Sequence, residues 1–129
     1  MMTDPNAYYA GGRGVELYDL FTGGGLLAGD IEFYLECARR FGGPILELGT
    51  GTGRVLVPLA DAGHEVLGMD LSRPMLDRAA AKLRERPELS QHVRLVEGDM
   101  TSFDLKCRRR CPCRTLRGIR SSRRQLVML

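Results

Sequence analysis

The sequence has no long apolar run and few aromatic side chains. Its 129 residues include four Phe, four Tyr and no Trp. No stretch approaches the roughly 20 apolar residues of a membrane-spanning helix, and no apolar stretch follows a basic start as in a signal peptide. We therefore expect no membrane span and no signal peptide, and we expect a cytoplasmic location.

The cysteines lack the spacing of a zinc site. Cys107, Cys111 and Cys113 form the pattern C-x3-C-x-C with no histidine nearby, and Cys37 lies far upstream. This pattern matches none of the usual paired zinc spacings, and structural disulfides are rare in the cytoplasm. The sequence therefore predicts neither a metal site nor a structural disulfide.

Acidic residues are absent from residues 106–129. Nine of the 19 Lys and Arg lie there, whereas all 16 Asp and Glu lie in residues 1–105. Such an asymmetry is typical of an arm that contacts nucleic acid or a membrane. The arginine run has no interleaved aromatic residue, which argues against stacking on single strands but is compatible with nonspecific, salt-sensitive nucleic-acid contact. An out-of-frame or otherwise aberrant end, a genuine basic tail, and a divergent end with a short strand at 125–129 all fit this composition.

A glycine-rich turn is the most informative feature that is present. After an apolar run, residues 47–54 are E-L-G-T-G-T-G-R, with glycines at 49, 51 and 53, and a helical pattern follows. Glycine lets the backbone approach a ligand closely, and the N–H groups at a helix N-terminus point at an anion. The dinucleotide pattern G-x-G-x-x-G is missing, because its third glycine would fall at Arg54, which argues against the alternative of an NAD(P)-dependent dehydrogenase.

An acidic residue ends the next apolar run. Asp70 follows Gly49 by 21 positions. A carboxylate about 20 residues after such a turn suits a ligand with a ribose, whose hydroxyls it accepts. Glu47, Asp70 and Asp99 all fall at the carboxyl ends of predicted parallel strands, where ligands bind in such sheets. The sequence therefore predicts one shared nucleotide-cofactor site.

Short apolar strands alternate with helical patterns, which predicts a parallel α/β sheet. The predicted helices are 15–21, 31–41, 54–62 and 73–86, and the predicted strands are 45–48, 65–69 and 93–96. Asp30 and Ser72 are the predicted N-caps of the second and fourth helices. We divide the chain into an arm with a short helix (1–29), a sheet domain (30–105) and a basic tail (106–129).

These motifs resemble class I S-adenosylmethionine-dependent methyltransferases over about residues 30–105. E-L-G-T-G-T-G-R is similar to the family's first motif, 63–72 to its second strand with the acidic end, 74–82 to its next helix, and 93–100 to its third strand. The resemblance implies a Rossmann-like, three-layer αβα fold truncated to about the first three βα units, with strand order 3-2-1. The outer edge of the first strand would then be bare and open to self-association.

The resemblance also implies S-adenosylmethionine as the cofactor. Its methionine end would be lined by Glu47, Gly49, Thr50, Gly51 and Gly53. Asp70 would accept hydrogen bonds from both ribose hydroxyls.

The remaining implied contacts are with the adenine. Leu71 and Met75 would lie near the ring, Asp99 would accept from its exocyclic amine, and Met100 would cover its face. Plain alternatives stay open at this stage: a turn residue for Asp99, and core packing for the two methionines.

The implied activity is methyl transfer to a nucleophilic O, N or C of a small molecule. No catalytic base is predicted, because substrate-side residues in this family come mostly from the fourth strand onward. Tyr8, Tyr9 and Tyr18 fit either a lid over the cofactor or a loosely docked arm. A non-catalytic cofactor-binding remnant and an interaction module built on the basic tail are the alternative functions.

Overall fold

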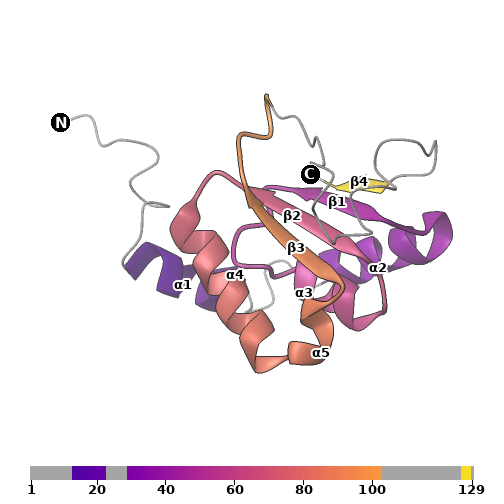
Figure 1. The fold of residues 1–129 in the computed structure, drawn as a ribbon, viewed down its shortest axis with the longest axis horizontal. Coiled ribbons are helices and arrows are strands. Elements are labelled where there is room, and N and C mark those ends of the chain that lie inside the picture. The colour runs from indigo at the N-terminus through magenta and orange to yellow at the C-terminus, as the bar shows by residue number, and fades with distance from the viewer. Residues whose placement is uncertain (1–12, 23–28, 103–125, 129) are drawn as a thin grey trace.

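The computed structural model describes residues 13–22, 29–102 and 126–128 (Figure 1). The helices are α1 (Arg13–Thr22), α2 (Asp30–Phe41), α3 (Leu56–Asp61), α4 (Arg73–Glu85) and α5 (Pro87–Ser90). The strands are β1 (Ile45–Leu48), β2 (Val66–Asp70), β3 (Val93–Glu97) and β4 (Leu126–Met128). None of the helices in these ranges combines the length and apolarity needed to cross a bilayer.

The four strands form one parallel sheet in the order β3-β2-β1-β4. Helical segments connect β1 to β2 and β2 to β3, as parallel pairing requires (Figure 1). The predicted α/β class and the predicted order 3-2-1 are therefore confirmed. The carboxyl ends of β1, β2 and β3 meet at one edge of the sheet, which places the predicted site residues there.

The outer edge of β1 is not bare, so that prediction is wrong. Residues Ile45–Glu47 pair in parallel with Leu126–Met128 of β4. A short apolar run from the end of the chain supplies the missing backbone partners, and the self-association expected through this edge loses its basis. Residues 106–125 of the predicted basic tail, with their three cysteines, lie outside the described residues, as do Tyr8 and Tyr9.

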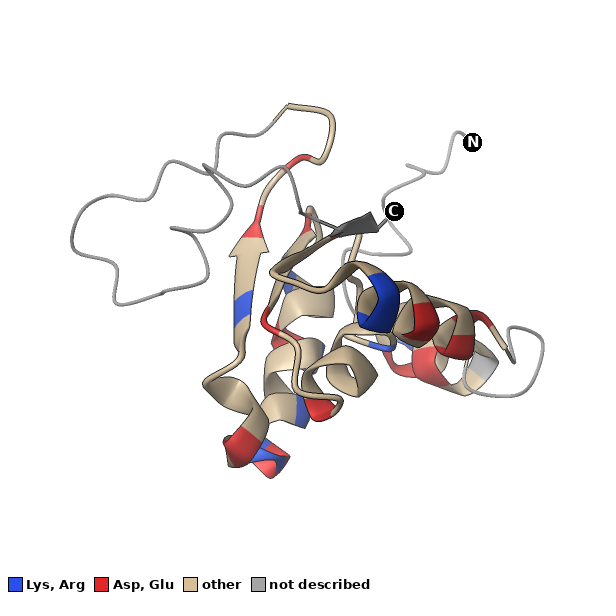
Figure 2. Ribbon diagram, turned by 90° about the vertical axis from the view of Figure 1, so that its right-hand side faces the viewer, with Lys and Arg blue, Asp and Glu red and all other residues tan. Residues whose placement is uncertain are grey.

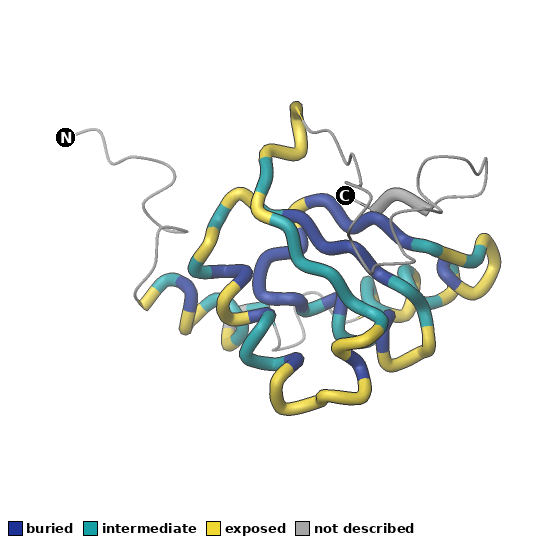
Figure 3. Tube along the Cα trace, viewed as in Figure 1, coloured by how far each residue is buried: buried dark blue, intermediate teal, exposed yellow. Residues whose placement is uncertain are grey.

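The described helices pack on one face of the sheet, and α1 lies beside α4 (Figure 1). Because successive strand residues point to opposite faces, each strand supplies side chains to both sides. The buried side chains of the helical face are Ala38, Ile45, Val55, Leu56, Leu59, Ala60, Val66, Leu83 and Leu89. Those of the opposite face are Leu46, Leu48, Leu67 and Met69. Figure 3 shows burial concentrated in β1, β2 and the segment that follows β1.

Acidic and basic residues are interspersed along the helices (Figure 2). The start of α2 differs from the prediction. Gly42, at φ +75°, ends α2, but Gly29 and not the predicted Asp30 occupies its N-cap position. Asp30 is the first helical residue, and its carboxylate pairs with Arg54 instead of capping the helix.

The start of α4 is as predicted. Ser72 is its N-cap, and its hydroxyl accepts from the Met75 N–H at 3.3 Å. Pro87 ends the run of α4 and begins α5, a single turn that was not predicted. Residues 51–55 form turns, so α3 begins two residues later than predicted.

Candidate cofactor-binding site

The glycine turn folds back over the end of β2. The N–H groups of Gly49 and Thr50 both donate to the Met69 carbonyl, at 2.8 and 2.9 Å. Gly49, Gly51 and Gly53 have φ of +72°, +57° and +80°, the left-handed region that residues with a Cβ rarely adopt. The alternate spacing of the glycines is therefore a backbone requirement of this turn.

The carboxylate of Asp70 is held by backbone N–H groups from two loops. Its Oδ2 accepts from Gly51 at 2.8 Å, and its Oδ1 accepts from Ser72 at 2.8 Å. An ionised carboxylate offers about four lone-pair positions, so each oxygen keeps capacity for a further donor. Asp70 is thus an oriented acceptor that remains able to receive two hydroxyls.

Glu47 is buried at the end of β1 beneath the turn. Burial raises its pKa to about 7, although the hydrogen bond from Thr50 and the charge of Arg54 act in the opposite direction. The Thr50 hydroxyl donates to Glu47 Oε2 at 3.0 Å. This carboxyl group therefore changes charge close to neutral pH.

Arg54, the residue after the last glycine, forms a two-bond ion pair with Asp30. Its Nη1 donates to Asp30 Oδ1 at 2.9 Å, and its Nη2 donates to Oδ2. These hydrogen bonds raise the pKa of Arg54. The pair fixes the first turn of α2 against the glycine turn, and it leaves the guanidinium beside the cleft.

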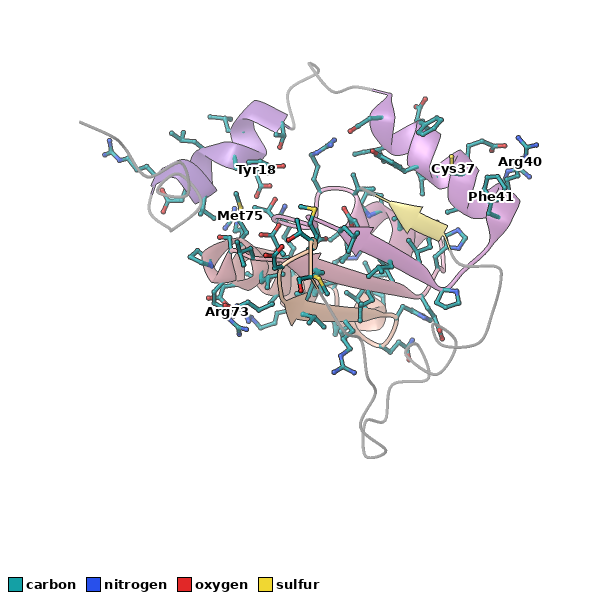
Figure 4. The ribbon with its side chains drawn as sticks, turned by 90° about the horizontal axis from the view of Figure 1, so that it is seen from above. Tyr18, Cys37, Arg40, Phe41, Arg73 and Met75 are labelled. Carbon is teal, nitrogen blue, oxygen red and sulfur yellow. The ribbon has the colours of Figure 1, made fainter. Side chains whose placement is uncertain are left out.

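The cleft has two parts that share Tyr18 and Gly49. A cavity of about 300 Å³ is lined by Tyr18, Gly49, Gly51, Asp70, Met75 and Met100. A second cavity of about 190 Å³ is lined by Tyr18, Tyr34, Glu47, Gly49, Thr50, Arg54 and Val55. Figure 4 shows Tyr18 on α1 near Met75 at the start of α4. The two parts together form an elongated site across the carboxyl ends of β1 and β2.

Most of the predicted residues meet in this cleft. The larger cavity collects Gly49, Gly51, Asp70, Met75 and Met100, and the smaller one collects Glu47, Gly49 and Thr50. Gly53 supports the turn from behind, where a Cβ would lie 3.3 Å from the Ala79 Cβ.

Leu71 and Asp99 are not among the residues that line either cavity. Leu71 is 62% exposed. The Asp99 carboxylate accepts from the N–H and hydroxyl of Thr101, at 2.8 and 2.6 Å, which lowers its pKa and closes a turn. The adenine contacts assigned to these two residues stay predictions.

Sequence reasoning gave no role in the cleft to Tyr34, Arg54 or Val55, which line it, or to Asp30 and Asp19, which brace it. Tyr34 lies on the inner face of α2 with Ile31, Leu35 and Ala38, a helical spacing that is visible in the sequence. The ion pair of Asp30 has no comparable signal, because its partner Arg54 lies 24 residues away. Asp19 likewise contacts residues that are distant in sequence.

The family of the chain follows from this region. Residues 45–110 match the sequence pattern of a family described as "Methyltransferase domain". The chain belongs to the class I S-adenosylmethionine-dependent methyltransferase family. The matched segment contains the glycine turn, Asp70 and the turn after β3.

Several curated relatives carry methyltransferase names. The chain is 36% identical over 104 residues to the cypemycin N-terminal methyltransferase of a Streptomyces species. The matched region covers 76% of this chain and 38% of that protein. The chain is 34% identical over 84 residues to the nocamycin O-methyltransferase of Saccharothrix syringae, which covers 57% of this chain and 30% of that protein. This methyltransferase chain therefore spans well under half the length of these relatives.

Solved methyltransferases share the fold. The CcbJ methyltransferase of Streptomyces caelestis is 39% identical, with a TM-score of 0.55 over 60% of this chain and 33% of that one. The glycopeptide N-methyltransferase MtfA in complex with S-adenosylmethionine is 37% identical, with a TM-score of 0.55 over 62% of this chain and 37% of that one. The Rossmann-like methyltransferase fold of the described sheet is thus shared with enzymes of similar sequence.

Proposed function

We propose that the chain binds S-adenosylmethionine in the two-part cleft and presents it for methyl transfer to a nucleophilic atom of a small molecule. The orientation of Asp70 is the observation that carries this proposal. Its two oxygens are fixed by the Gly51 and Ser72 N–H groups, and they keep free lone pairs toward the larger cavity that Asp70 lines. A ribose needs such an acceptor.

The other residues of the cleft fit the chemistry of the same ligand. The left-handed turn at Gly49 and Gly51 removes side chains from the floor of the larger cavity, so a ligand can approach the backbone. Met75 and Met100 supply apolar walls suited to a neutral aromatic base. When bound, S-adenosylmethionine supplies a methyl group on a sulfonium centre, which is a good leaving group.

The smaller cavity fits an amino-acid end. Glu47, with a pKa of about 7, and Arg54, whose guanidinium also pairs with Asp30, line it together. A carboxylate and a cation side by side suit a ligand that carries an ammonium and a carboxylate. We assign the methionine end of the cofactor to this part and the nucleoside to the larger part.

The acceptor class rests on the relatives. One is named as an N-terminal methyltransferase and another as an O-methyltransferase, which supports an amine or hydroxyl acceptor. The described residues contain no group that we assign as a catalytic base. The contribution that we assign to the described residues is positioning of the cofactor.

Calorimetric titration of the purified chain with S-adenosylmethionine tests the proposal. We expect saturable binding, which Asp70→Asn weakens by about 1.5–3 kcal/mol, the cost of losing hydrogen bonds to a charged acceptor. Asp61→Asn is the matched control, because Asp61 is an exposed aspartate paired with Arg86. A chain that unfolds cooperatively on heating yet binds no cofactor would overturn the proposal, and the motifs would then reflect ancestry only.

A further inference from the structure

Asp19 of α1 ties that helix to two other parts of the molecule. Its Oδ1 accepts from the Thr52 hydroxyl, within the glycine turn, and from Lys82 Nζ on α4 at 2.8 Å. Its Oδ2 accepts from Arg78 Nε on α4 at 3.3 Å. Lys82 Nζ also lies 3.3 Å from the Thr52 hydroxyl. These four side chains, which we name the α1 latch, join α1, the turn and α4 at one point.

The latch sets one carboxylate against two cations and is partly shielded from water. The Asp19 side chain is 22% exposed, and Thr52 is fully buried. Burial raises the pKa of Asp19, but the hydrogen bonds from Lys82 and Thr52 outweigh it and lower the pKa below the usual value. Asp19 is therefore ionised at neutral pH, and its pairing is stronger than that of a fully exposed ion pair.

The rest of α1 has little apolar attachment. Among its described side chains Val15 is buried, whereas Leu17 and Leu20 are exposed. A helix of 10 residues is marginal unless tertiary contacts hold it. The α1 latch is thus a main contact between α1 and the domain.

The neighbour of Asp19 lines the proposed cofactor site. Tyr18 borders both cavities, and its hydroxyl lies 3.7 Å from the position that a Cβ on Gly51 would occupy. Since Tyr18 and Asp19 are adjacent on one helix, the hold on Asp19 sets where the Tyr18 ring lies. Opening the α1 latch would remove one wall from both parts of the cleft.

We propose that Asp19 is a positioning residue for the cofactor: through Thr52, Lys82 and Arg78 it keeps α1 closed over the cleft and thereby slows cofactor release. The proposal rests on the proposed function for the identity of the ligand. The latch and its hold on α1 are properties of the free chain.

Surface plasmon resonance with the immobilised full chain and S-adenosylhomocysteine measures the predicted effect. We expect Asp19→Asn to raise the dissociation rate constant about tenfold, since two ion pairs to one carboxylate are lost, and to change the association rate constant less than threefold. The control Asp77→Asn removes an exposed carboxylate on α4 that pairs with Arg73, and it should leave both constants unchanged. Equal rate constants for Asp19→Asn and the native chain would overturn the proposal.

Hydrogen exchange of the ligand-free chain separates the latch from the proposed function. Asp19→Asn should speed exchange of the α1 amides and leave β1 and β2 protected. If the native chain binds no S-adenosylhomocysteine, the proposed function fails. Independently of that result, equal exchange of the α1 amides in Asp19→Asn and in the native chain would reject the α1 latch.

A milder variant covers the case in which Asp19→Asn does not fold. Arg78→Ala removes the half-exposed donor at 3.3 Å. It should raise the dissociation rate constant two- to threefold, because it removes one of the two ion pairs of Asp19 and so weakens the hold on α1 less. Dissociation as slow as in the native chain would contradict the latch.

Discussion

At the glycine-turn end of the cleft, the fold already holds the polar groups in place, whereas at the end after β3 the side chains face solvent. Asp70 is oriented by Gly51 and Ser72 before any ligand arrives. Met100 is 48% exposed, and Asp99 is exposed in a local turn. Groups that are already in place cost little entropy on binding, whereas exposed ones must be ordered by the ligand. We expect most of the cofactor affinity to come from the fixed end.

The largest expected effect concerns the buried carboxyl at the fixed end. The pKa of Glu47 is raised to about 7 in the folded chain, so the native state holds this proton more tightly than the unfolded state does. The stability it contributes is full below about pH 4.5 and is lost as the pH rises through about 7, on the order of 2–3 kcal/mol. In urea unfolding at several pH values, the free energy of unfolding of Glu47→Gln should rise relative to that of the native chain over this range.

The substitution keeps the hydrogen-bonding shape toward Thr50 but removes the titration. Glu88→Gln, at an exposed residue of α5, is the control and should show no such gain. A free-energy difference between Glu47→Gln and the native chain that stays constant from pH 4.5 to 8 would contradict the raised pKa.

A second prediction concerns a substitution that disturbs the packing of the fixed end. A Cβ on Gly68 of β2 would lie 2.5 Å from Leu56 Cδ1 and 2.9 Å from Thr50 Oγ1. Gly68→Ala should therefore lower the free energy of unfolding by about 1–3 kcal/mol, as overpacking does in a dense core. Urea unfolding measures it.

The control lies at the exposed end. At Gly98 a Cβ would first meet the flexible Met69 side chain at 3.4 Å, so Gly98→Ala should cost clearly less. If the two variants lose the same stability, the contrast between the two ends does not extend to their packing.

The smallest expected effect is at the exposed end. Asp99→Asn keeps Oδ1 as the acceptor for Thr101, and it should weaken S-adenosylmethionine binding by less than about 1 kcal/mol in calorimetry. Its natural comparison is Asp70→Asn at the fixed end. A loss as large as that of Asp70→Asn would show that the ligand fixes Asp99 as firmly as the fold fixes Asp70.

The strands and the glycine turn could be predicted because their signals are local, whereas the sheet order was implied by the family resemblance. Gly49, Gly51 and Gly53 mark a left-handed backbone, and Ser72 caps the helix that begins at the next residue. Apolar runs of the right length mark β1 to β3.

The remaining features depend on partners far along the chain. Asp19 meets Thr52 and Lys82, which are 33 and 63 residues away. Asp30 was predicted as a cap because its local context fits one, but Arg54 competes for its carboxylate. The pairing of β4 with β1 joins two segments that have β2 and β3 between them in the sequence. Three-dimensional proximity decides each of these contacts, and sequence spacing carries no trace of it.

The position of the tyrosines gives the chain an optical property. It has four tyrosines and no tryptophan, so tyrosine emission is not masked by energy transfer to an indole. Tyr18 and Tyr34 both line the cleft. A bound cofactor whose two ends occupy the two cavities therefore changes the surroundings of two of the four tyrosines, and ligand entry can be followed by intrinsic fluorescence without a label.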